Sequence, residues 1–150
     1  MKRKVLPWLL VILWMALIFY LSHQPANTSN GLSKGATEII VETVEKIAPS
    51  VDINIKNFNH NLRKNAHFFA YLVLGILVAN GLRNSGVSGY RAIGLAILIC
   101  SLYAISDEVH QLFVPGRGGQ IKDVIIDSAG ASMGIGLYLL INKADPERNI

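Results

Sequence analysis

Four apolar runs, each about as long as a membrane-crossing helix, divide this chain. They cover residues 5–21, 66–82, 92–113 and 124–141, the third only because it continues past Ile105. A helix needs about 20 apolar residues to cross ~30 Å of hydrocarbon. Because a helix also satisfies its own backbone hydrogen bonds in lipid, each run is predicted to be a transmembrane helix. The expected fold is therefore an all-α polytopic membrane protein.

Composition supports this class. Hydrophobic residues make up 51% of the 150 residues and charged residues only 16%, a small share for a soluble domain. One domain, residues 1–150, is expected. The formal charge is +4, but the basic residues are scattered between the apolar runs rather than gathered into a stripe. The predicted partner is therefore a lipid bilayer, and nucleic acid is not indicated.

The residues before the first run predict the orientation. Lys2, Arg3 and Lys4 precede it without any acidic residue, and basic flanks favour the cytoplasmic side. Four crossings place both termini on the same side. We therefore expect a multi-pass protein of the cell membrane with cytoplasmic N- and C-termini. The first run exceeds the usual length of a signal-peptide core, which predicts an uncleaved anchor.

The long outer segment, residues 22–65, separates the first two runs. Its beginning is rich in Ser, Asn, Gly and Pro and is predicted to be a loop. Apolar residues then recur at helical spacing from Leu32 to Ile47, and Pro49 ends the pattern. This spacing predicts an extracytoplasmic amphipathic helix on the membrane surface. A solvated spacer helix is the alternative.

Polar residues gather where the predicted helices meet one face of the membrane. With four alternating crossings, the end of the first helix, the start of the second, the end of the third and the start of the fourth share that face. These junctions carry most of the polar membrane-edge residues of the chain. The arrangement predicts one polar site, and the orientation predicts that it faces outward.

The start of the second helix contributes Lys64, His67 and Tyr71, which are spaced i, i+3, i+7 and share one helix face. Lys64 and Tyr71 alone also fit a snorkelling lysine and an aromatic anchor at the membrane surface. His67 lies about one turn further inside, where a polar side chain needs a partner. The segment is therefore a candidate part of the site.

The end of the third helix carries two adjacent carboxylates, Asp107 and Glu108, followed by Gln111. Acidic groups at a helix C-terminus oppose the helix dipole. The pair therefore needs counter-ions, for which Lys64, His67 and Arg117 are the candidates. Glu108 is the stronger functional candidate, since Asp107 need not face the same way.

The turn after the third helix presents Arg117, a residue suited to bidentate binding of phosphate or carboxylate. Asp123 and Asp127 follow at i, i+4. A helix-capping role alone would explain Asp123, whereas Asp127 lies one turn deeper. Beyond them, Gly130 and Gly134 form a G-x-x-x-G pair, which predicts close contact between helices.

These motifs resemble the signature of the VanZ-like family over about residues 60 to 136, and Ser22-x-Gln24 fits as well. The resemblance implies a small bacterial four-helix membrane protein, whose namesake raises resistance to the glycopeptide antibiotic teicoplanin. The resemblance does not assign a chemical reaction to the chain. The matching motifs are Arg63-Lys64-x-x-His67-x-x-x-Tyr71, Ser106-Asp107-Glu108-x-His110-Gln111-x-x-Val114-Pro115-Gly116-Arg117 and Asp123-Val124-x-x-Asp127-x-x-Gly130.

The first functional hypothesis is that the outer site binds or modifies an anionic cell-envelope component. Examples are a lipid-linked cell-wall precursor, a phospholipid and a peptidoglycan carboxylate. Glu108 and His67 would act as an acid and base pair, with Asp107 beside them. The residues assigned to substrate binding are Lys64, Tyr71, Gln111, Arg117, Asp123 and Asp127. Whether the protein is an enzyme is left open.

Two alternatives remain at this stage. In one, the polar cluster is a salt-bridge network that locks the helices, and the protein is a non-catalytic scaffold or binds a partner. In the other, His67, Glu108, His110 and an aspartate hold a divalent metal, although their spacing matches no recognised ligand pattern. No cofactor is predicted, and the chain has no glycine-rich nucleotide loop that would indicate ATP-driven export.

Overall fold

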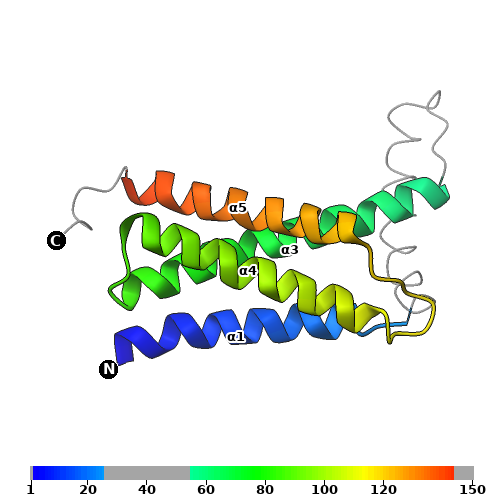
Figure 1. The fold of residues 1–150 in the computed structure, drawn as a ribbon, viewed down its shortest axis with the longest axis horizontal. Helices are drawn as coiled ribbons and strands as arrows, with labels where there is room; N and C mark the ends of the chain where they lie inside the picture. The colour runs from blue at the N-terminus through cyan, green and yellow to red at the C-terminus, as the bar shows by residue number, and fades with distance from the viewer. Residues whose placement is uncertain (1, 26–54, 144–150) are drawn as a thin grey trace, which may run out of the picture.

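The computed structural model describes residues 2–25 and 55–143, and the side-chain surroundings of residues 5–25 and 65–142. The described residues form α1 (Lys2–Ser22), α3 (Ile55–Asn84), α4 (Gly89–Gln111) and α5 (Ile121–Lys143) (Figure 1). Each helix contains a stretch long and apolar enough to cross a membrane. No strand occurs within the described ranges. The predicted all-α fold with four membrane-crossing helices is confirmed.

Two helix boundaries differ from the sequence prediction. The second predicted helix was expected to begin near residue 66, but α3 begins at Ile55. The polar residues 55–65 therefore belong to α3, and the segment between the first two helices is shorter than predicted. The third predicted helix was expected to reach residue 113, but α4 ends at Gln111. The predicted amphipathic helix between Leu32 and Ile47 lies outside the described residues.

The helices alternate in direction, so that the four predicted junctions lie together. In Figure 1 the end of α1, the start of α3, the end of α4 and the start of α5 lie at one end of the bundle. We call this end, which contains Ser22, Gln111 and Ile121, the junction end. The start of α1 and the end of α5 lie at the opposite end. The parity argument from the sequence therefore places the polar segments correctly.

The outer surface of the bundle is apolar along its length. Large hydrophobic side chains such as Leu13 on α1, Leu102 on α4 and Leu140 on α5 are exposed. So many exposed apolar side chains would be unfavourable in water but match the hydrocarbon of a bilayer. The described helices therefore form a multi-pass membrane bundle.

The closest helix pair is α3 and α5, which pack through glycine. A methyl group added to Gly130 would collide with the backbone carbonyl of Phe68, and one added to Gly134 would collide with that of Leu72. Small residues let helix backbones approach closely in lipid, where van der Waals packing drives association. The predicted close contact of the G-x-x-x-G pair is confirmed.

Hydrogen bonds from aromatic side chains hold α1 against its neighbours. The Trp14 indole Nε1 donates to the Ala70 carbonyl of α3 at 2.9 Å, and the Tyr103 hydroxyl of α4 donates to the Met15 carbonyl at 2.6 Å. Because lipid offers no competing partners, such bonds help to fix the position of α1.

The glycine contact predicts a large difference between two substitutions on α5. Gly134→Ala forces α3 and α5 apart and should cost about 1–3 kcal/mol of stability, the usual cost of overpacking. Gly136→Ala is the matched control, because a methyl group there meets nothing within 4 Å. Thermal unfolding of the purified protein in detergent measures both. Equal melting temperatures for the two variants would contradict this packing.

Candidate functional site

A buried hydrogen-bond network joins the ends of α1 and α4. The Ser22 hydroxyl donates to Asp107 Oδ2 at 2.8 Å. The Gln111 amide donates to the same oxygen at 3.1 Å and to Glu108 Oε1 at 3.2 Å. All four side chains are buried, with Ser22 at 0% and Asp107 at 2% exposure. Buried polar groups are stable only when they are hydrogen-bonded, so this network fastens the two helix ends together.

The loop after α4 closes over this network. Gly116 has φ 74°, a conformation that glycine adopts most easily, and it directs Arg117 back toward the helix ends. The guanidinium donates to the Leu21 carbonyl at 3.2 Å and to Gln111 Oε1 at 3.5 Å. Further along, the Gln120 backbone N–H donates to Glu108 Oε2 at 2.8 Å. Each carboxylate oxygen of Glu108 therefore accepts a hydrogen bond.

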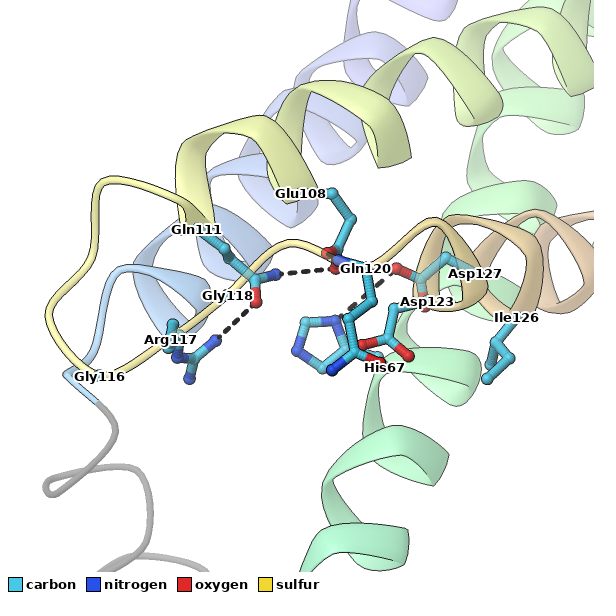
Figure 2. Close-up of a pocket in the computed structure, with 10 residues that line it drawn as sticks. All are labelled: His67, Glu108, Gln111, Gly116, Arg117, Gly118, Gln120, Asp123, Ile126 and Asp127. Atoms are coloured by element: carbon cyan, nitrogen blue, oxygen red, sulfur yellow. Dashed lines mark hydrogen bonds and ion pairs between the residues drawn. The ribbon is translucent and has the colours of Figure 1, made fainter.

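A pocket of about 200 Å³ lies at the junction end, between α3, α4, the loop and α5 (Figure 2). Six of the nine predicted site residues line it, namely His67, Glu108, Gln111, Arg117, Asp123 and Asp127. The other lining residues are Gly116, Gly118, Gln120 and Ile126. Side chains from distant parts of the sequence thus meet in one polar space.

Asp127 forms the inner wall of the pocket from α5. It is 1% exposed, and neither of its carboxylate oxygens accepts a hydrogen bond from the described residues. Its Oδ2 lies 3.9 Å from His67 Nδ1, which makes an ion pair when the imidazole is protonated. A carboxylate removed from water without hydrogen bonds is energetically costly. Among the described pocket residues, Asp127 is therefore the one that most lacks hydrogen-bond donors.

Two predicted site residues lie outside the pocket lining. Asp107 belongs to the network with Ser22, behind Glu108. Tyr71 is fully buried in the bundle core, where its ring faces that of Tyr103 at a centroid distance of 6.0 Å. Its full burial also contradicts the alternative role of a lipid-facing aromatic anchor. The side chain of Lys64 lies outside the described residues.

His110 faces α1 rather than the pocket. Its Nε2 lies 3.0 Å from Nδ1 of His23, and its ring packs on Phe19 at a centroid distance of 4.3 Å. The ligand set of the metal hypothesis, which needs His110 beside His67 and Glu108, is therefore not assembled. Across the described ranges, no group of three or more His, Cys, Asp or Glu residues is arranged to hold a metal ion.

Two contributions to the site were not predicted from the sequence. The pairing of Ser22 with Asp107 is one of them, because 85 positions of sequence separate the two residues. Gln120 contributes its backbone N–H to Glu108, and a backbone group leaves no mark on residue type. The alternation of the four membrane crossings, which brings the ends of α1 and α4 together, is the one sequence feature that could have suggested the pairing of Ser22 with Asp107.

The charges in the pocket are separated in space. Figure 2 shows Arg117 at one end of the lining and Asp123 and Asp127 at the other, with His67 between them. The guanidinium suits a phosphate or carboxylate, whereas the aspartates suit hydrogen-bond donors or a cation. Glu108 and the His67 imidazole add two groups that can exchange protons with a bound molecule.

Comparison with known families agrees with this architecture. The family model described as VanZ/LLP1 matches residues 7–142, which covers most of the chain and all four described helices. The chain belongs to the VanZ/LLP1 family. The predicted resemblance is thereby confirmed. No curated protein and no solved structure matches the chain.

In this VanZ/LLP1 protein, removal of the Ser22 hydroxyl that bonds to Asp107 should measurably lower the free energy of unfolding. Ser22→Ala leaves the buried Asp107 carboxylate with one donor fewer and should cost about 1–3 kcal/mol. Ser132→Ala is the control, because the Ser132 hydroxyl is exposed and bonds only to the Ser128 carbonyl of its own helix. Thermal unfolding in detergent compares the two variants. A melting temperature for Ser22→Ala equal to that of the control would contradict the fastening role.

Proposed function

We propose that this VanZ/LLP1 protein binds an anionic component of the cell envelope in the junction-end pocket and exchanges protons with it through Glu108 and His67. The observation that carries the proposal is the meeting of His67, Glu108, Arg117 and Asp127 in one pocket of an otherwise lipid-facing bundle. Ionisable side chains at membrane depth are costly and commonly mark binding or transfer sites.

Arg117 is the proposed anion-binding group. Its two hydrogen bonds described above go to neutral oxygens of Leu21 and Gln111, which hold the side chain in place. The planar guanidinium, with five N–H donors, matches the geometry of a phosphate or carboxylate. Lys64, whose side chain is not described, remains a predicted second cation at the start of the span.

Glu108 and His67 are the proposed acid and base. Hydrogen bonds from Gln111 and Gln120 fix the Glu108 carboxylate, and Asp127 lies within 3.9 Å of the His67 ring. Fixed groups of this kind lose little entropy when a ligand binds. Asp107 supports them through Gln111 and is assigned a positioning role.

The proposed ligand comes from the envelope rather than from an antibiotic. A pocket of about 200 Å³ is below the usual range for drug-sized molecules, but it has room for a lipid head group or one sugar unit. We extend the proposal to teicoplanin resistance, as the family resemblance implies, acting through the envelope component. The proposed orientation places the pocket on the outer face and both termini in the cytoplasm.

The second candidate function is a non-catalytic scaffold. The Ser22–Asp107–Gln111 network and the bond from Arg117 to Leu21 favour it, because they join α1 to α4 without any ligand. In that case the whole cluster would serve the fold, and the protein would act by binding a partner in the membrane.

Glu108→Gln separates the two candidates. Gln keeps the side-chain length and one acceptor oxygen but loses the charge and the capacity to donate or accept a proton as an acid. We expect cells that make this variant to lose resistance to teicoplanin while the amount of folded protein in the membrane stays constant. The measurements are drug susceptibility and the monodisperse peak of the solubilised protein.

Two further variants serve as references for that experiment. Asp107→Ala should lower resistance and folded protein together, because it removes the oxygen that accepts hydrogen bonds from both Ser22 and Gln111. Arg91→Gln, at an exposed position in the first turn of α4, should change neither. Full resistance with Glu108→Gln would contradict the proposed chemistry, and a parallel fall of resistance and abundance would favour the scaffold.

A further inference from the structure

We infer that the ligand of the pocket is zwitterionic: an anionic group binds Arg117, and a protonated primary amine binds Asp127 at the opposite end. This rests on the proposed function and names its ligand class. The chemistry is that of a phosphate joined by a short chain to an amine, as in the head group of an aminophospholipid.

The balance of charge in the pocket argues against a ligand that is only anionic. Among the described residues that line the pocket, three are carboxylates, Glu108, Asp123 and Asp127, whereas the basic groups are the Arg117 guanidinium and the His67 imidazole. Like charges repel more strongly beside protein than in bulk water. A negative ligand without a positive part would therefore gain from Arg117 and lose against the three carboxylates. A ligand with a positive group as well gains at both ends.

Asp127 identifies where the positive group binds. It is 1% exposed, it lines the pocket, and no described residue donates a hydrogen bond to either of its oxygens. The contact to His67 Nδ1, at 3.9 Å, is longer than a hydrogen bond. Both oxygens of Glu108, in contrast, already accept hydrogen bonds. An ammonium group carries three donors and would satisfy Asp127.

The arrangement of the lining fits a ligand with two ends. Arg117 and Asp127 lie on opposite sides of His67 in Figure 2. A ligand with a single charged group would use only one side of the pocket. Metal is the less suitable cation, since no group of three or more His, Cys, Asp or Glu side chains is arranged to hold a metal ion in the part of the chain that the structure describes.

The surroundings of the pocket favour a lipid as the source of the amine. The pocket lies at the junction end of a bundle whose outer surface is apolar along the membrane-crossing stretches. An aminophospholipid can keep its acyl chains in the bilayer while its head group enters from the membrane edge. Free phosphoethanolamine has the same charged groups without the chains and is therefore the comparison ligand.

The test compares two lipids that differ in one charge. Purified wild-type protein in detergent is titrated with phosphatidylethanolamine and with its N-acetylated form, which keeps the phosphate but has no ammonium. We expect the protein to bind the lipid with the free amine about tenfold or more tightly than the N-acetylated lipid. This is the difference in affinity that one charge-assisted hydrogen bond contributes. Asp127→Asn should abolish this preference, because it removes the charge and breaks no described hydrogen bond. Arg91→Gln should keep it.

The outcomes separate this inference from the proposed function. Equal binding of both lipids by wild type, unchanged in Asp127→Asn, would overturn the zwitterion and leave anion binding intact. Binding of neither lipid would overturn both. Free phosphoethanolamine that binds as tightly as the lipid would keep the ligand class and overturn the lipid source. If Asp127→Asn does not fold, the comparison of the two lipids on wild-type protein decides by itself, because equal binding of both overturns the zwitterion.

Discussion

The close approach of α3 and α5 at Gly130 determines the geometry of the pocket. The Phe68 carbonyl lies directly against Gly130, so neighbouring His67 is brought to within 3.9 Å of Asp127, about one turn before Gly130 on α5. Lipid tails are as apolar as the helix surfaces, so backbone contact rather than hydrophobic burial fixes this distance. Gly130, which has no functional side chain, therefore sets the distance between His67 and Asp127.

The polar residues of the junction end divide into two groups with different roles. Ser22 and Asp107 are joined by a hydrogen bond that holds α1 to α4, and Gln111 donates to the same Asp107 oxygen. His67 and Asp127 instead face a space that protein atoms leave open. Glu108 and Gln111 take part in both, since they are joined in the network and also line the pocket. The scaffold hypothesis from the sequence therefore concerns the network, and the binding hypothesis concerns the pocket.

Hydropathy and parity predicted the four helices and the end where polar residues meet, because both follow from the properties of a bilayer. They could not choose between Asp107 and Glu108, which are about 100° apart on a helix, so only one faces the pocket. Tyr71 shares a face with His67 but lies about 6 Å deeper, inside the core. The spacing of residues along a helix predicts the direction in which a side chain points. Whether that side chain lies in the pocket or in the core, and how the loop after α4 closes, depend on tertiary packing.

The most direct test of this account is a crystal structure of the protein grown in a lipidic mesophase that contains phosphatidylethanolamine. The account predicts non-protein density that extends from the Arg117 guanidinium to the Asp127 carboxylate, with its amine end at Asp127. A closed pocket, in which Asp127 and Glu108 pair directly with basic side chains of the protein and no density separates them, would contradict it.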